Sequence, residues 1–204
     1  MDLEHFDNLT ERLVEEIRAA INHYALYKAI QVQVKESPDV LNESVHFWSL
    51  TINAHLEATR TSLSRVYDRE DKSLGLAKWL SLFESHFLKP EFFESNELDN
   101  YSRVPLKEND ISDDLALVSH SNPLVETLYL RHRHTEIAHI SLKNAQKQVS
   151  FFKKYPLTSD EIEELLTLAA SIVNKYTVHH NGVYHCIVGW QHDDHKKLFD
   201  RLNR

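Results

Sequence analysis

The stretch LEHFDNLTERLVEEIRAAINHYALYKAIQVQV, residues 3–34, decides the fold class. Its largely apolar side chains recur at alternating steps of four and three residues, which is the spacing of one face of an α-helix. This face consists of Leu13, Ile17, Ala20, Tyr24, Tyr27, Gln31 and Val34. The spacing predicts one long amphipathic helix, and we expect its apolar face to be core or a contact with a second copy of the chain.

Two capping signals predict the next helices. Ser37-Pro38 is typical of an N-cap followed by proline at the first helical position, so we expect a second helix from there to about Tyr67. Ser73 is placed to cap a third helix that ends at Pro90. The apolar face of that third helix consists of Leu76, Leu80, Phe83 and Phe87, with Trp79 beside them.

The second half of the chain carries further capping signals. Asn122-Pro123 predicts another helix start, and Thr158-Ser159-Asp160-Glu161 is a capping box that opens a helix ending at Asn181-Gly182. The apolar face of this last helix consists of Ile162, Leu165, Leu166, Ala169, Ile172, Val173 and Tyr176. Residues 192–204 predict a short polar helix.

The composition agrees with an all-α fold. The 204 residues include only three glycines and five prolines, whereas β-barrels and sandwiches need many tight turns built from these residues. We expect a single domain over residues 1–204, an antiparallel bundle of about five to six helices. An irregular acidic insertion around 89–121, with one short helix near Asp113–Val118, interrupts it.

The cysteine content and the first residues predict a cytoplasmic protein that does not contact a membrane. Cys186 is the only cysteine, so no intrachain disulfide is possible, and we expect its thiol to be a small buried side chain. The sequence begins Met1-Asp2-Leu3-Glu4, which is acidic where a secretory signal would be basic. No apolar run approaches the roughly 18 residues of a membrane span.

The charge is unevenly distributed along the chain. The formal net charge of −8 argues against general nucleic-acid binding. Residues 91–114 carry eight acidic and two basic side chains, a net of −6, whereas residues 131–154 carry six basic and one acidic, a net of +5, with three histidines. We therefore expect an anionic ligand to bind the second segment, and the acidic segment to shield it or to bind a partner.

The densest group of reactive side chains is Arg131-His132-Arg133-His134-Thr135-Glu136-Ile137-Ala138-His139. On a helix, its polar side chains share a patch about a third of the circumference wide, with Arg133 and His139 at the two edges. Histidine can take or return a proton near neutral pH, and arginine can bind a phosphate and stabilise transition-state charge. The pattern favours phosphodiester cleavage without a metal, and a dyad would bring the Arg of one copy towards the His of the other.

A purely structural interpretation stays open at this point. His139 lies near the helical angle of Leu128 and Val125, which would suit a hydrogen-bonded core histidine, and Arg133 would suit an ordinary surface cation. Ser73 and Thr158 are more plausible as helix caps than as nucleophiles, because neither has a His and a carboxylate nearby in the sequence.

Metal binding is a second alternative. Glu136-x-x-His139 and Glu43-x-x-His46 have the spacing of di-metal ligand pairs, but a simple up-down bundle would place them at opposite ends. His132, Glu136 and His139 would form a zinc face on one helix. We predict no metal and no cofactor. The remaining histidine groups, expected to be solvated helix ends, are His179-His180 with His185, and His192-Asp193-Asp194-His195.

The same stretch resembles the signature of the HEPN superfamily, in which Arg is followed by a polar residue and, four to six residues later, by His. Arg133, His134 and His139 fit this signature. The resemblance is closer to the abortive-infection, U-type (AbiU-like) branch and covers roughly residues 5–200. The runs that carry it are Leu63–Asp68 with Ser73-Leu74, Pro156–Thr158 and Ile172–Tyr176.

The resemblance implies an all-α homodimer whose two motif helices meet in a cleft. It also implies a metal-independent endoribonuclease of the toxin or phage-defence kind. His139 would be the acid/base, Arg133 would stabilise the phosphate, and His134 would orient the pair. The alternative that the family leaves open is a catalytically inactive dimer that binds a nucleotide or a protein partner.

The resemblance also implies binding partners. We expect RNA to contact Arg131, His132 and Lys143 of the cationic segment. The other expected partners are a second copy of the chain and a nucleotidyltransferase-type or other antitoxin. Ser141 stands where a toxin subgroup has a tyrosine that a nucleotidyltransferase modifies, so this chain departs from that pattern.

Overall fold

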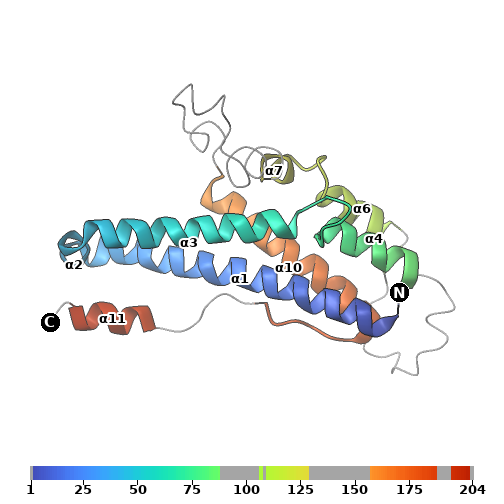
Figure 1. Cartoon of the computed structure of the whole chain (residues 1–204), viewed down its shortest axis with the longest axis horizontal. Helices are drawn as coiled ribbons and strands as arrows, with labels where there is room; N and C mark the ends of the chain where they lie inside the picture. Colours follow the sequence, from blue (N-terminus) through green and yellow to red (C-terminus); the bar gives the residue numbers. More distant parts are fainter. Residues whose placement is uncertain (1, 88–105, 108, 129–156, 188–193, 203–204) are drawn as a thin grey trace.

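The structure, a computed structural model, describes residues 2–87, 106–107, 109–128, 157–187 and 194–202. Within these ranges it contains eight helices and no strand (Figure 1). The all-α prediction is therefore confirmed. The described helices outnumber the five to six expected, because turns divide some of the predicted segments. No described helix combines the length and the apolar character that crossing a membrane requires.

The longest described helix, α1 (Leu3–Glu36), and α3 (Val45–Val66) lie side by side and antiparallel over most of their length (Figure 1). The predicted first helix is thus confirmed almost to the residue. Its N-terminus is capped by Asp2, whose carboxylate accepts the backbone N–H of His5 at 2.9 Å.

The helix predicted from Ser37 to about Tyr67 is wrong as a single element. It is divided into α2 (Pro38–Glu43) and α3, with Ser44 between them in a non-helical conformation. The helix start is confirmed, since Ser37 is the N-cap residue of α2 and Pro38 its first residue. The Ser37 side chain makes no capping hydrogen bond, and its backbone N–H bonds to the carbonyl of Gln33 at the end of α1. The break has a tertiary cause: it turns the chain back along α1 while Val40 and Leu41 stay buried.

The apolar face of α1 follows the prediction only in its first two thirds. Leu13, Ile17 and Tyr24 are buried, whereas Val34 is 37% exposed, and Ile30 is buried in its place. A straight helix drifts by about 20° per heptad from a repeat of 3.5 residues. The buried face therefore rotates along α1, from the main core towards α2 and the C-terminal helix.

Three shorter helices follow: α4 (Leu76–Phe87), α6 (Asp110–Leu117) and α7 (Pro123–Glu126). α6 confirms the short helix expected near Asp113, while Pro90 lies outside the described residues. The predicted cap Ser73 is wrong, because α4 begins three residues later and the Ser73 N–H bonds to the Glu70 carbonyl in a turn. Gly75 permits this turn, since a Cβ there would lie 2.0 Å from the carbonyl oxygen of Asp68.

The helix α10 (Ser159–Asn181) confirms the strongest sequence signals. Thr158 and Glu161 form a reciprocal capping box, and Gly182 ends the helix with a φ of 73°. All seven predicted apolar positions are buried; they are Ile162, Leu165, Leu166, Ala169, Ile172, Val173 and Tyr176.

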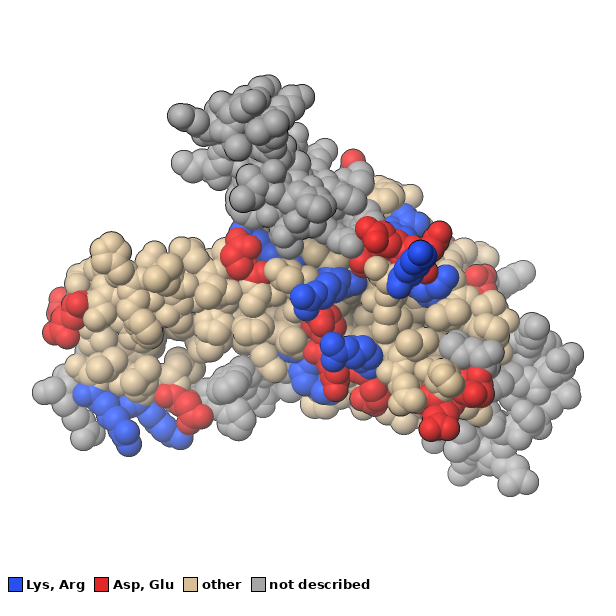
Figure 2. Space-filling view, in the orientation of Figure 1, with Lys and Arg blue, Asp and Glu red and all other residues tan. Residues whose placement is uncertain are grey.

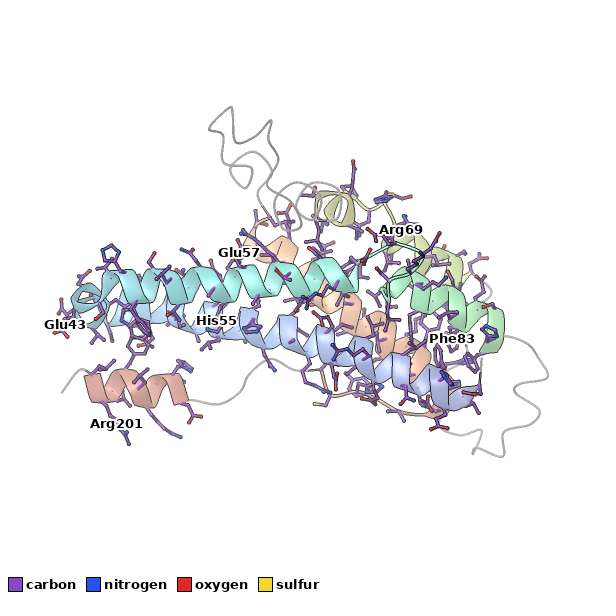
Figure 3. The ribbon with its side chains drawn as sticks, viewed as in Figure 1. Glu43, His55, Glu57, Arg69, Phe83 and Arg201 are labelled. Carbon is purple, nitrogen blue, oxygen red and sulfur yellow. The ribbon has the colours of Figure 1, made fainter. Side chains whose placement is uncertain are left out.

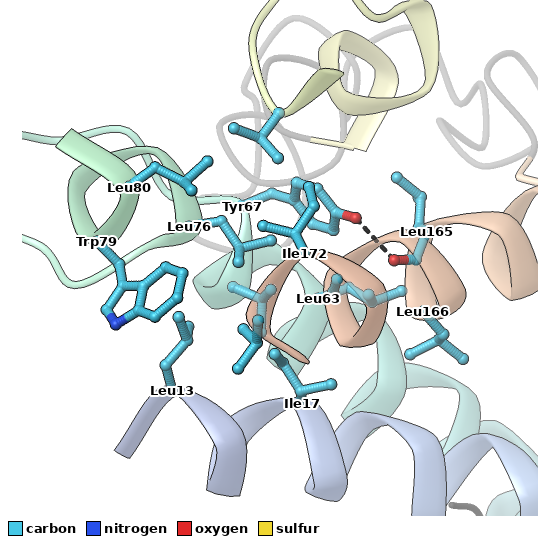
Figure 4. Close-up of a cluster of buried hydrophobic side chains, with 14 of the residues drawn as sticks. Leu13, Ile17, Leu63, Tyr67, Leu76, Trp79, Leu80, Leu165, Leu166 and Ile172 are labelled. Atoms are coloured by element: carbon cyan, nitrogen blue, oxygen red, sulfur yellow. Dashed lines mark hydrogen bonds between the residues drawn. The ribbon is translucent and has the colours of Figure 1, made fainter. Parts of the chain in front are cut away.

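The main core lies where α10 crosses the N-terminal half of α1, the end of α3, and α4 (Figure 4). Trp79 is fully buried there, stacks on Phe6 at 5.5 Å between ring centroids, and donates its Nε1–H to the Thr10 hydroxyl at 2.9 Å. The Tyr67 hydroxyl donates to the Leu165 carbonyl at 2.7 Å, which ties α3 to α10. Such partners offset the cost of burying polar atoms.

A second, smaller cluster closes the opposite end of the α1–α3 pair. It joins α2 and α11 (Asp194–Leu202), the short polar helix predicted for the C-terminal region. Phe199 of α11 stacks on Trp48 of α3 with 5.0 Å between ring centroids. The apolar residues of this cluster fix α11 against the two long helices (Figure 1).

The seam between α1 and α3 contains two histidines in contact. Nδ1 of His23 and Nδ1 of His55 lie 2.9 Å apart. Burial, with a smaller contribution from His23, lowers the pKa of His55 below its usual 6.5. Its neutral form is therefore favoured by folding, and this stabilisation is complete above pH 6.5 and is lost as the pH falls through the lower folded-state pKa.

We expect the melting temperature to fall as the pH is lowered from 7 to 5, and part of this fall to depend on His55. The measurement is the melting temperature across this range for the wild type and for His55→Gln. Because the variant lacks the titrating imidazole, its pH profile should be flatter below pH 6.5. Identical slopes for the two proteins would contradict the assignment.

Candidate functional site

The predicted reactive residues lie between two anchored points of the fold. Arg133, His134 and His139, with the predicted RNA contacts Arg131, His132 and Lys143, fall in residues 129–156, outside the described residues. Their roles therefore stay predictions. The structure describes the chain on either side of them, up to Leu128 and from Leu157 onward.

The first anchor is α7, which leads into the motif. Asn122 caps it by accepting the Leu124 N–H at 3.0 Å, and its amide donates to the Leu117 carbonyl at 2.9 Å. The predicted start at Asn122-Pro123 is thus confirmed. Val125 and Leu128 are fully buried in the main core, so the residue immediately before the motif segment is held firmly.

The second anchor is the start of α10, which follows the motif segment. Leu157 is buried in the main core, and the Thr158 N–H donates to the Glu161 carboxylate at 2.7 Å. The Glu161 N–H donates to the Thr158 hydroxyl at 3.3 Å. Thr158 is therefore a cap rather than a nucleophile, and both ends of residues 129–156 attach to the same core.

An ionic cluster joins the end of the acidic insertion to α10. Lys175 Nζ lies 2.8 Å from both Asp110 Oδ1 and Asp114 Oδ2, and the Tyr176 hydroxyl donates to Asp114 at 2.8 Å. Burial alone would lower the pKa of Lys175, but the hydrogen bonds to the two aspartates outweigh it and raise that pKa. Asp110 and Asp114, two of the eight acidic side chains in residues 91–114, therefore form ion pairs within the fold.

Arg60 on α3 has a side chain that is mostly covered, which its sequence context did not indicate. The side chain of Arg60 is only 11% exposed, and its guanidinium lies 3.4 Å from the Glu57 carboxylate. Burial lowers the pKa of Arg60, and the Glu57 carboxylate partly offsets this. Spacing alone gave no signal, because a single arginine in a helix is usually a solvated side chain.

A groove of about 750 Å³ lies between α1 and α10. At one end, Lys28 donates to Glu163 at 2.9 Å, and the Tyr24 hydroxyl bonds to the same carboxylate at 3.2 Å. The hydrogen bond from Lys28 lowers the pKa of Glu163, and burial raises that of Tyr24. These groups are satisfied by one another, so the groove is suited to binding rather than to proton transfer.

Two of the runs that carry the family resemblance contribute residues to the main core. Leu63–Asp68 ends α3 inside the main core, where Tyr67 bonds to α10, and Ile172–Tyr176 packs on the same core from α10. A family model described as AbiU2 (HEPN_AbiU2) matches residues 3–201, which include these runs and the Arg131–His139 stretch.

The chain belongs to the HEPN AbiU2 family. The resemblance stated from the sequence is therefore confirmed over nearly the whole chain. Comparisons with curated proteins and with solved structures find no match.

The histidines at the end of α10 in this AbiU2 family member are not solvated, which corrects the sequence expectation. His179 and His180 are 9% and 2% exposed, and His185 is 9% exposed. The His180 ring packs against Phe87 of α4 with 4.9 Å between centroids, and against Phe6 of α1 at 5.4 Å. The ends of α1 and α4 cover this end of α10, which its sequence alone did not indicate.

Cys186 is also corrected, since it is exposed rather than buried. The adjacent residue is fixed instead: the His185 N–H donates to Asn174 Oδ1 at 2.7 Å, and the Asn174 amide donates to the His185 carbonyl at 3.1 Å. This pairing holds the backbone after α10 and leaves the next side chain facing solvent.

The di-metal alternative loses one of its two ligand pairs. Glu43 is the last residue of α2 and His46 lies in α3, with the break at Ser44 between them, so the pair does not share one helix. Glu136 and His139 lie outside the described residues, as do His192 and Asp193. The described residues contain no cluster of three or more His, Cys, Asp or Glu side chains suited to a metal ion.

Proposed function

We propose that this AbiU2 family member is a cytoplasmic, metal-independent endoribonuclease with a toxin or phage-defence role. The observation that carries the proposal is the family match over residues 3–201, which includes the sequence Arg133-His134 followed by His139. The two anchors support it, because they fix both ends of the motif segment on one core. A rigid support suits a site that must hold two side chains against a phosphate.

The proposed reaction is attack by a ribose 2′-hydroxyl on the adjacent phosphorus. His139 takes the hydroxyl proton while the new O2′–P bond forms, and Arg133 stabilises the charge that develops on the phosphate oxygens. The P–O5′ bond breaks, His139 returns the proton to the departing 5′-oxygen, which leaves as a hydroxyl, and the other product ends in a 2′,3′-cyclic phosphate. His134 orients the pair in this scheme.

The proposed partners follow from charge and symmetry. RNA contacts Arg131, His132 and Lys143, within a segment of net charge +5. A second copy of the chain supplies the opposing motif helix, so that Arg133 of one copy acts with His139 of the other. An antitoxin, of the nucleotidyltransferase type or another, neutralises the ribonuclease in this proposal.

The test is RNA cleavage in an excess of EDTA, with the ends of the products mapped. We expect the purified protein to cleave, and the new ends to be a 2′,3′-cyclic phosphate and a 5′-hydroxyl. Cleavage that requires added Mg²⁺, or that yields a 3′-hydroxyl, would overturn the proposed mechanism.

A binding role without catalysis is the second candidate, and one surface favours it. Residues 44–56 carry no Lys, Arg, Asp or Glu, and this part of α3 shows no charged side chains in Figure 2. Phe47 and Leu50 are 60% and 72% exposed there. Exposed apolar patches of this kind often mark protein contacts. Failure of a folded dimer to cleave any RNA would favour this role.

A further inference from the structure

The two histidines in the α1–α3 seam form the most chemically defined cluster of the described residues. His23 Nδ1 and His55 Nδ1 face each other at 2.9 Å, with 5.2 Å between the ring centroids and 37° between the ring planes. The two rings come from different helices, and Figure 3 shows His55 on the side of α3 that faces α1. Both side chains are partly buried.

The proton positions on the two neutral imidazoles decide how the facing Nδ1 atoms interact. If one Nδ1 carries a proton, it donates to the other, which gives a single N–H···N hydrogen bond. If both rings carry their proton on Nε2, two Nδ1 lone pairs face a shared space. A cation that accepts both lone pairs would replace the hydrogen bond with two bonds to nitrogen.

We propose that His23 and His55 bind one divalent transition-metal ion, with Cu²⁺ or Ni²⁺ preferred. With metal–nitrogen bonds of about 2.0–2.1 Å, two nitrogen ligands lie about 2.9 Å apart at a right angle and about 3.3 Å apart in a tetrahedron. The observed distance of 2.9 Å fits the right angle. Right angles between nitrogen ligands are characteristic of the square-planar and tetragonal sites of Cu²⁺ and Ni²⁺.

Water would occupy the remaining coordination positions of the metal ion. His55 lines a cavity of about 340 Å³ between the two long helices and α11, so solvent reaches His55. Among the described residues, no third His, Cys, Asp or Glu completes a cluster with the two histidines. The site is therefore open, its two ligands are not among the proposed catalytic residues, and it does not rest on the proposed ribonuclease.

Binding at this site would also link the two long helices. The metal would bind only when α1 and α3 are in register, because 32 residues separate the two ligands in the sequence. A ligand that binds the folded state alone raises the melting temperature in a concentration-dependent way. Protons compete for the same nitrogens, so the affinity should fall as the pH is lowered.

The experiment titrates the untagged protein with Cu²⁺ at pH 7.5 and compares the wild type with His23→Gln, His55→Gln and the control His46→Gln. His46 is an exposed histidine of the same helix as His55. We expect the tightest dissociation constant to rise at least tenfold in the first two variants and to stay unchanged in the control. Unchanged binding in all three variants would overturn the proposal.

A second measurement uses only the wild type, so it does not depend on how the variants fold. Pulsed electron paramagnetic resonance counts the imidazoles bound to one equivalent of Cu²⁺. Two coordinated imidazoles are expected. One imidazole, or three or more, would overturn the two-histidine site.

Discussion

Replacing His139 by alanine is expected to lower RNA cleavage about 10²–10⁴-fold, the usual contribution of a positioned acid/base. Arg133→Ala is expected to lower it by a similar factor, because the guanidinium would no longer stabilise the phosphate charge. Neither change should alter the melting temperature, since both side chains are proposed to act on the RNA rather than to pack in the core. The measurement is the cleavage rate in EDTA at saturating RNA, together with a thermal melt.

The matched control is His46→Ala, which removes an exposed histidine from α3 and should leave cleavage unchanged. The melt distinguishes the two interpretations of His139. A core histidine would lower the melting temperature when it is removed, and RNA cleavage would fall only in proportion to the folded fraction. Full cleavage by a folded His139→Ala variant would contradict the catalytic role.

Trp79→Ala is expected to produce the largest loss of stability, about 3–5 kcal/mol in the free energy of unfolding. The indole is fully buried, stacks on Phe6, and satisfies the Thr10 hydroxyl through its Nε1–H. It also meets the Tyr176 ring edge-on, with 6.1 Å between centroids. Alanine would remove these contacts from three helices at once and leave a cavity where α1, α4 and α10 meet.

Urea unfolding of the variants measures this loss. Trp79→Phe should recover most of the stability, because it keeps an aromatic ring, although it loses the hydrogen bond to Thr10 and part of the indole's volume. Leu50→Ala is the matched control: Leu50 is 72% exposed, and its removal should change the free energy of unfolding by no more than about 0.5 kcal/mol. Equal effects of Trp79→Ala and Leu50→Ala would contradict the assigned core.

The fold could be predicted from the sequence where a signal is local. The Thr158 capping box, the Asn122 cap and Gly182 each depend on bonds or backbone angles within a few residues, and each is confirmed. Ser37 and Ser73 have the right residue type, but neither caps a helix through its side chain, because the path of the chain around them is set by tertiary packing. The break at Ser44 has the same origin.

The surroundings of individual side chains were harder to predict. His180 ends a helix, where solvent is the usual neighbour, yet Phe6 and Phe87 from distant parts of the chain cover it. The contact of His23 with His55 and that of Lys28 with Glu163 depend on how separate helices align, 32 and 135 residues apart. Spacing within one helix carries no information about such pairs. The predicted catalytic residues lie outside the described residues and stay predictions.

The most direct test of the central claim mixes two inactive proteins. If each site combines Arg133 of one copy with His139 of the other, a mixed dimer of Arg133→Ala and His139→Ala subunits contains one intact site of two. Equal mixing with subunit exchange then restores about a quarter of wild-type RNA cleavage in EDTA, since about half of the dimers are mixed. Cleavage that stays at the level of the single variants, although mixed dimers form, would contradict the account.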